Sequence, residues 1–216
     1  MRVLIACEYS GTVREAFAAR GHRVTSCDIL PTDTPCSPGA RHIQGDVLPL
    51  LSESWDLVIG HPPCTYLTAA GNRWFYHPDD KHLPTGERRP HPAYPNRRKD
   101  AEKAAQFFLT IYHSGDRCCV ENPVGTMTSR FRKADQTIQP WQFGHRASKA
   151  TCLWLRGLPA LTPTEIVEKD EVIVFPSGKR MRKWAYDMSC LPHKQRAKAR
   201  SKTFQGIADA MASQWG

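Results

Sequence analysis

Two short motifs carry the residue types from which a nucleophilic active site can be built. His61-Pro62-Pro63-Cys64 follows an apolar run at 55–60, and Glu121-Asn122-Pro123 follows another at 117–120. A cysteine thiolate is a strong nucleophile, and a carboxyl group beside it can act as an acid–base partner. The sequence therefore predicts a Cys64–Glu121 pair. The alternative for Cys64 is a place in the core, which free cysteines often fill.

Apolar runs and helical patterns alternate along the chain and would position these motifs. The alternation predicts an α/β fold with a mostly parallel sheet and helices on both faces. Such sheets bind ligands beyond the carboxyl ends of their strands, where both motifs lie. The expected strands cover residues 2–7, 23–28, 55–60, 117–120 and 150–155, and the expected helices cover 12–20, 98–113 and the chain end to 215. A hairpin with strands over 171–175 and 180–186 is expected around the turn at 176–179.

The first βα turn and the acid after the second strand suggest a nucleotide site. In nucleotide-binding α/β folds an acid about 20 residues beyond this turn binds ribose hydroxyls, and Asp28 has that spacing. The turn at 8–11 has only one glycine, so it is not the dinucleotide fingerprint, and an ordinary surface aspartate is the alternative. We expect Ser10 to cap the first helix. Residues 31–45 are rich in Pro, Thr, Ser and Gly, which predicts a loop.

Positive charge is concentrated in the second part of the chain. The chain carries +9 overall, residues 1–60 carry −2, and residues 176–216 carry +7. This distribution favours a nucleic-acid partner over a charge that serves solubility alone. Residues 72–98 interleave aromatic residues with arginines, which fits substrate contact or anchoring of the loop itself. The candidate phosphate contacts are Arg73, Lys179, Arg182, Lys194, Arg196, Lys198 and Arg200.

The same sequence indicates a cytoplasmic protein with reduced thiols. No stretch has the apolar length of a membrane span, and no secretion signal accompanies the eight cysteines. Cys190 and His193 lack a second ligand pair, so we expect no metal site. A monomer is the default expectation.

Taken together, the two motifs resemble those of the cytosine-5 DNA methyltransferases. That family carries a Pro-Cys nucleophile motif and a Glu-Asn motif in this order. The resemblance implies a class I S-adenosylmethionine-dependent methyltransferase fold, which is Rossmann-like, with a small C-terminal hairpin region. It assigns residues 1–155 and 200–216 to the catalytic domain and residues 156–199 to a reduced recognition region. Compact phage and bacterial homologues, the latter from restriction–modification systems, are the nearest type.

The resemblance also implies roles for individual residues. Cys64 would attack cytosine, Glu121 would contact the base at N3, and Arg146 would match a basic motif of the family. Tyr9 stands where the family has a glycine. The S-adenosylmethionine contacts would be Cys7, Glu8, Tyr9, Ser10, Gly11, Asp28, Ile29, Asp46, Val47 and Pro62.

The sequence leaves three functions open. The first is methyl transfer to C5 of cytosine in DNA, which the basic end of the chain favours. The second is the same chemistry on a free cytidine nucleotide, or with a modified one-carbon or carboxymethyl donor, which the short recognition region favours. The third is a non-catalytic DNA-binding protein on a methyltransferase scaffold. Amino-group methyltransferases resemble Asp-Pro-Pro-Tyr at this site, so Cys64 argues against them.

Overall fold

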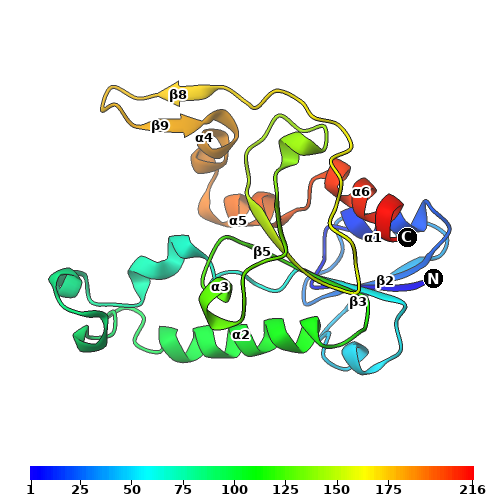
Figure 1. Cartoon of the computed structure of the whole chain (residues 1–216), viewed down its shortest axis with the longest axis horizontal. Helices are drawn as coiled ribbons and strands as arrows, with labels where there is room; N and C mark the ends of the chain where they lie inside the picture. The colour runs from blue at the N-terminus through cyan, green and yellow to red at the C-terminus, as the bar shows by residue number, and fades with distance from the viewer.

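A seven-stranded sheet forms the centre of the molecule in the computed structural model, which describes all 216 residues (Figure 1). Its strand order is β3-β2-β1-β4-β5-β7-β6. The first five strands are parallel and follow the Rossmann order, β7 runs antiparallel to β5, and β6 runs antiparallel to β7. The strands are β1 Arg2–Ala6, β2 Arg23–Asp28, β3 Ala40–Gln44, β4 Leu57–Gly60, β5 Cys118–Pro123, β6 Gln136–Ile138 and β7 Thr151–Arg156.

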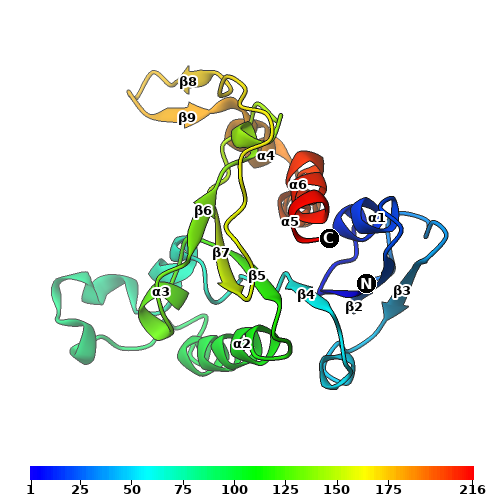
Figure 2. The same ribbon diagram turned by 45° about the vertical axis from the view of Figure 1, so that its right-hand side comes forward.

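Helices cover both faces of this sheet, as the sequence predicts. Helices α1 (Thr12–Ala18) and α6 (Gln205–Trp215) pack together on one face, and α2 (Arg97–Tyr112) lies on the other (Figure 2). Alternate residues of each central strand enter the two cores, which is why these strands are apolar throughout. Val3 and Ile5 pack with Trp215, whereas Leu4 packs with Phe108. The mixed α/β fold with a mostly parallel sheet is therefore confirmed.

A smaller unit lies beside the central sheet, where the sequence predicts a hairpin. Strands β8 (Val172–Val174) and β9 (Arg180–Arg182) pair antiparallel, and Gly178 in their turn has φ 76°. Helices α4 (Lys183–Cys190) and α5 (His193–Ser201) lead back to α6 (Figure 1). The remaining elements are α3 (Met127–Arg130) and five short 3₁₀ helices, η1 Leu50–Ser52, η2 Ala69–Trp74, η3 Pro78–His82, η4 Thr85–Glu87 and η5 Pro140–Gln142.

Two sequence-based assignments are wrong. Residues 31–45 are not all loop, because β3 forms the edge of the sheet, where partly buried side chains produce no apolar run. The second hairpin strand ends at Arg182, and the chain turns into α4 instead of staying extended to Tyr186. The basic residues after Leu191, for which no element was predicted, form helix α5. No helix has the length and apolar character that a membrane crossing requires.

Helix α1 is capped by Glu8, which corrects the prediction for Ser10. Glu8 is buried, and its carboxylate accepts the backbone N–H groups of Val13 at 2.7 Å and Arg14 at 3.2 Å. Ser10 accepts the N–H of Thr12 only at 3.3 Å and donates to Glu8. A carboxylate suits this position because the first turn of a helix presents free N–H groups and a partial positive charge.

Candidate active site

Cys64 and Glu121 lie at the same edge of the sheet. Strands β4 and β5 are parallel neighbours with Gly60 opposite Val120, so Cys64 lies four residues beyond β4 and Glu121 lies in the last half of β5. Cys64 is exposed, which excludes the alternative that it fills the core. The Glu121 side chain is only 15% exposed. The arrangement that the sequence predicts for these two residues is present.

His61, the first residue of the Cys64 motif, contacts Glu121 directly. Its Nδ1 lies 3.0 Å from Oε2 of Glu121, and its side chain is 9% exposed. Its backbone N–H donates to Ala6, so the chain is still held against β1 at this point. The second ring nitrogen, Nε2, is buried without a hydrogen-bond partner. Sequence analysis assigned no role to His61, although it stands beside the two prolines.

Asn122 holds the loop that carries Cys64. Its side-chain amide donates to the carbonyl of Pro62 at 3.1 Å, and the residue is 1% exposed. The bond joins β5 to the segment just after β4, so it fixes the bend that places Cys64. The Oδ1 atom of Asn122 is buried without a partner.

Lys149 is the basic side chain that lies beside Glu121. The two residues line one small recess with Thr151 and, from the start of α6, with Thr203 and Phe204. Arg146, for which a catalytic role was predicted, instead pairs with Glu168 at 3.1 Å, and its side chain is 61% exposed. Arg146 makes no contact with Cys64 or Glu121 that would support the predicted catalytic role.

The direction of β7 explains the position of Lys149. Because β7 is antiparallel to β5, its first residue, Thr151, lies opposite Pro123 at the carboxyl end of β5. Lys149 comes just before Thr151 and so reaches the active edge of the sheet. The first half of α6 also lies at this edge, because Ile207 and Met211 line the same recess as Glu121 and Lys149.

The charges around the site favour opposite proton states for Cys64 and Glu121. Loss of hydration, followed by the charge of Glu121, raises the pKa of the Cys64 thiol, against smaller opposing effects of Lys149 and Arg200. Burial alone would raise the pKa of Glu121, but the hydrogen bond with His61 and the charges of Lys149 and His61 lower it. In the free protein the pair therefore favours a thiol and a carboxylate.

The predicted nucleotide contacts surround the carboxyl ends of β1, β2 and β3. Asp28 accepts the N–H of Leu30 at 2.9 Å and Asp46 accepts the N–H of Leu48 at 3.0 Å. In each case only one carboxylate oxygen is used, so the other is free to accept from a ligand hydroxyl or amine. Ile29, which directly follows Asp28, is 77% exposed and offers an apolar surface on which an adenine ring can lie.

These hydrogen-bond acceptors and the apolar surface would suit S-adenosylmethionine. The free oxygen of Asp28 could accept from the ribose diol, and that of Asp46 from the exocyclic amine of adenine. Ile29 could pack against the adenine ring. Val47 is buried in the core beneath Asp46 and Pro62 is buried beside the Cys64 loop, so both shape the site through packing.

The turn between β1 and α1 has an unusual backbone. Cys7 has φ 61°, the only non-glycine residue with positive φ, and Gly11 follows with φ 76°. The backbone N–H groups of Cys7 and Glu8 both donate to the carbonyl of Cys27, which fixes the turn against β2. Burial, followed by the charge of Asp28, raises the pKa of the Cys7 thiol to about 12, so this cysteine is no nucleophile.

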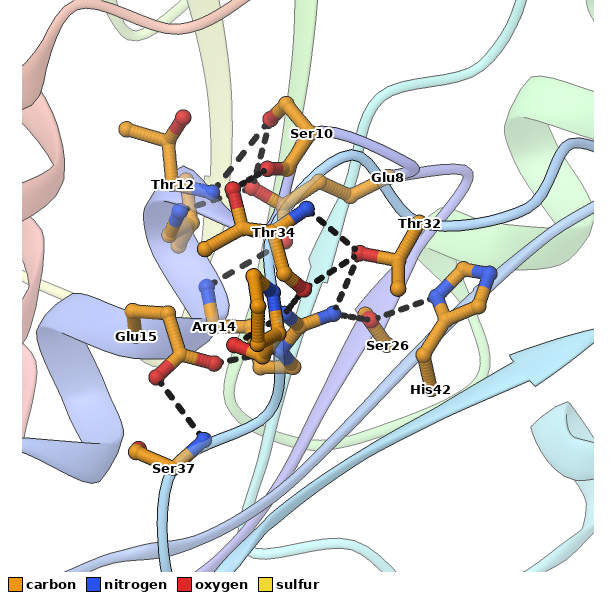
Figure 3. A network of polar contacts seen from close by, with 12 residues as sticks. Glu8, Ser10, Thr12, Arg14, Glu15, Ser26, Thr32, Thr34, Ser37 and His42 are labelled. Atoms are coloured by element: carbon orange, nitrogen blue, oxygen red, sulfur yellow. Dashed lines mark hydrogen bonds and ion pairs between the residues drawn. The ribbon is translucent and has the colours of Figure 1, made fainter.

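Arg14 ties the nucleotide-side loop to α1. This fully buried guanidinium donates to Ser26 and Thr32 at 3.0 Å and to the carbonyl of Thr34 at 2.7 Å (Figure 3). The Thr34 hydroxyl in turn donates to the carbonyl of Ser10. Arg14 therefore holds residues 32–34 against the turn that carries the candidate cofactor contacts. The charge pattern of the sequence alone did not indicate this structural role.

Helix α5 packs on the same turn. The Tyr9 hydroxyl donates to the carbonyl of Lys198 at 2.8 Å and lies 2.9 Å from the hydroxyl of Ser201. Asp33 pairs with Lys198 at 2.7 Å and with Lys202 at 2.9 Å. Tyr9 thus connects the basic helix to the candidate cofactor site.

The predicted phosphate contacts divide into free and engaged side chains. Lys179, Lys194 and Arg200 are exposed and make no hydrogen bond or ion pair with the protein. Arg182 donates to the carbonyl of Asp170, Arg196 to that of Leu191, and Lys198 pairs with Asp33. The three free side chains are therefore the best placed for phosphates.

Residues 66–98, which follow Cys64 along the chain, form a folded protrusion at the left of Figure 1. Arg97 at its base is 6% exposed and donates to the carbonyl of Thr65 at 2.8 Å, one residue after Cys64. Exposed Arg73 stacks over Trp74, with 4.6 Å from the guanidinium carbon to the ring centre. The aromatic and arginine residues both stabilise this segment and leave basic groups at its surface.

Comparison with known proteins adds no assignment. No known family model matches the chain, and no curated protein is significantly similar to it. The structure contains no cluster of three or more His, Cys, Asp or Glu side chains that could hold a metal ion. The argument for function therefore rests on the geometry of the site.

Proposed function

We propose that the protein is a DNA (cytosine-5-)-methyltransferase that uses Cys64 as its nucleophile. The observation that carries this proposal is the presence of an exposed Cys64 and a nearly buried Glu121 at one edge of a nucleotide-binding type of sheet. The two carboxylates on the nucleotide side, Asp28 and Asp46, lie at the carboxyl ends of neighbouring strands and fit the adenosine part of S-adenosylmethionine.

The chemistry requires both site residues. Carbon C5 of cytosine is a weak nucleophile, and addition of the Cys64 sulfur to C6 places negative charge on C5. Glu121 donates a hydrogen bond or proton at N3 and so stabilises the developing charge. S-adenosylmethionine, when bound, supplies the electrophilic methyl group. A base from the solvent then removes the C5 proton, the electron pair of that C–H bond forms the C5–C6 double bond, and the Cys64 sulfur leaves as a thiolate.

Other residues of the chain position the reacting groups. Asn122 fixes the backbone before Cys64 through Pro62. Lys149 lies beside Glu121, where a cation can hold the base carbonyl or the adjacent phosphate. A base in duplex DNA must leave the stack first, at a cost of a few kcal/mol, and the exposed Lys179, Lys194 and Arg200 provide phosphate contacts that offset this cost.

Methyl incorporation tests the proposal directly. Labelled S-adenosylmethionine is supplied with duplex DNA and with dCMP, side by side, at low and moderate salt. We expect label in C5 of DNA cytosine, strongest at low salt, and none with Cys64→Ala. Label in dCMP alone would support the free-nucleotide function, and DNA binding without any transfer would support the non-catalytic one. Either result contradicts the proposal.

A further inference from the structure

The two oxygens of the Glu121 carboxyl group have different surroundings. Oε2 lies 3.0 Å from Nδ1 of His61, in a contact between side chains that are only 15% and 9% exposed. Oε1 makes no hydrogen bond within the protein and is not fully buried. One oxygen is therefore held inside the protein, and the other is the atom that a bound base can reach.

The contact between His61 and Glu121 is a hydrogen bond from a neutral imidazole ring. Nε2 of His61 is buried without a hydrogen-bond partner, so a hydrogen on this nitrogen would have no acceptor, which is unfavourable. A neutral ring with its hydrogen on Nδ1 avoids this cost and presents a donor to Oε2. His61 therefore needs no positive charge to hold Glu121.

The backbone around His61 fixes the ring in place. The N–H of His61 donates to the carbonyl of Ala6 at 2.9 Å, which holds this residue against the end of β1. The carbonyl of the next residue, Pro62, accepts from the buried side chain of Asn122 at 3.1 Å. Two successive residues of β5, Glu121 and Asn122, thus contact the same two residues after β4, so the ring of His61 has little freedom to move away from Oε2.

We infer that neutral His61 holds Oε2 of Glu121 and so reserves Oε1 for the cytosine base. This inference rests on the proposed function. The hydrogen bond from Nδ1 persists when Glu121 is protonated, because Oε2 is then the carbonyl oxygen of the acid and still accepts. A hydrogen on Oε2 would face the Nδ1–H group, so the acid carries its hydrogen on Oε1, where it can donate to N3. His61 acts through Glu121 and is a positioning residue.

His61 keeps its Nδ1 hydrogen throughout the proposed reaction. The Cys64 thiol must lose one proton before its sulfur bonds to C6, and Glu121 must gain one to donate at N3, so the two changes balance. When the sulfur leaves as a thiolate, it regains a proton and Glu121 loses one. Burial alone would raise the pKa of Glu121, and the hydrogen bond from His61 lowers it, so His61 orients this carboxyl group and is not its acid.

A pair of substitutions at His61 separates the donated hydrogen bond from the bulk of the ring. His61→Leu fills the space without a donor, so single-turnover methyl transfer to DNA should slow about 10²-fold through the misplaced carboxyl group. Affinities for DNA and S-adenosylmethionine should change less than about twofold, because His61 contacts neither. His61→Asn places an amide N–H near the position of Nδ1 and should return the rate to within about fivefold of the wild type. His113→Leu, at an exposed histidine, is the control and should match the wild type.

Two kinetic results would overturn the proposal. One is equal transfer rates for His61→Leu and the wild type. The other is a His61→Asn variant as slow as His61→Leu, because the loss would then not depend on a donor to Glu121.

NMR of the wild type, with nitrogen-15 in its histidine rings, gives a readout that needs no transfer. The spectrum shows which ring nitrogen carries hydrogen, and we expect hydrogen on Nδ1 of His61 alone at pH 8. Hydrogen on Nε2, alone or in addition, would overturn the proposal even if the variants fail to fold. Absence of methyl transfer by the wild type would instead refute the proposed function, and the spectrum would still decide how His61 meets Glu121.

Discussion

At the scale of single residues, the proton state of Cys64 decides its reactivity. Loss of hydration and then the charge of Glu121 raise the pKa of the thiol, so the thiolate fraction at neutral pH is lower than for a free cysteine. Under the proposed mechanism, the Cys64 thiol must therefore lose its proton when the cytosine base binds. This resting state also protects an exposed thiol from alkylation and oxidation.

The reactivity of Cys64 toward iodoacetamide should show this effect. The alkylation rate should still increase at pH values where an ordinary thiol is already fully deprotonated, because a raised pKa shifts formation of the thiolate to higher pH. Glu121→Gln removes the negative charge, lowers the pKa of Cys64, and should speed its alkylation at pH 8 about three- to tenfold. Peptide-resolved mass spectrometry measures the rate, and exposed Cys190 is the control. Equal rates in wild type and variant would show that Glu121 does not influence the thiol.

Asp28 carries the second prediction at this scale. Its free carboxylate oxygen is proposed to accept a ribose hydroxyl, so Asp28→Asn should weaken S-adenosylmethionine binding by about 1–3 kcal/mol. Calorimetry gives the affinity. Asp56→Asn, at an acid that bonds the backbone of Arg2 away from the candidate site, is the control. Equal affinity for Asp28→Asn and wild type would make Asp28 an ordinary surface acid.

At the scale of elements, the sequence predicts most of what positions the site. The apolar runs before Cys64 and Glu121 predict neighbouring strands, and the pattern over 98–113 predicts α2 to within a residue at each end. The shared edge of the two motifs follows because parallel strands all end on one side. These strands and this helix can be predicted because each depends on the pattern of apolar residues within its own segment of the sequence.

The features that the sequence did not reveal depend on partners far along the chain. The place of Lys149 follows from the antiparallel direction of β7, which nothing in its own residues specifies. The His61–Glu121 contact follows from the register between β4 and β5. The cap of α1 was assigned to Ser10 because serine is a favoured capping residue, but Ser10 accepts only the N–H of Thr12. The carboxylate of Glu8, two residues further back, accepts the N–H groups of Val13 and Arg14.

Glu8 provides the prediction at this scale. Glu8→Ala leaves the first N–H groups of α1 without their acceptor beneath the candidate cofactor turn. The free energy of unfolding should fall by about 1–3 kcal/mol. Glu53→Ala removes a surface carboxylate paired with Arg2 and should cost less than about 1 kcal/mol. Urea denaturation compares the two, and a Glu8 variant as stable as the Glu53 variant would contradict the capping role.

At the scale of the whole molecule, charge divides the protein into two parts. The chain carries +9 in total, yet residues 1–60 carry −2 and include the acids of the nucleotide side. Residues 176–216, which include part of the hairpin unit and α5, carry +7, and α5 reaches the nucleotide side through Tyr9 and Asp33. A polyanion on this basic surface would thus lie next to both candidate sites.

The salt dependence of DNA binding tests this division. Lys179, Lys194 and Arg200 are exposed and unpaired, so their joint replacement by alanine should weaken binding to all DNA sequences alike. The log–log slope of affinity against salt should become shallower by about 0.9 for each lost contact. A control variant removes three exposed basic residues elsewhere, Arg20, Lys103 and Lys133, and should keep the wild-type slope. Equal slopes for the two variants would place the DNA surface elsewhere.

Covalent trapping of the base is the measurement that tests the central claim most directly. In duplex DNA that contains 5-fluorocytosine, fluorine replaces the C5 proton, so the enzyme cannot be released after methyl transfer. With S-adenosylmethionine present, the wild type should form a stable protein–DNA adduct, and mass spectrometry should locate the bond at Cys64. Cys64→Ala should form none. A wild-type protein that binds the DNA and cofactor but forms no adduct, or an adduct at another cysteine, would contradict nucleophilic catalysis by Cys64.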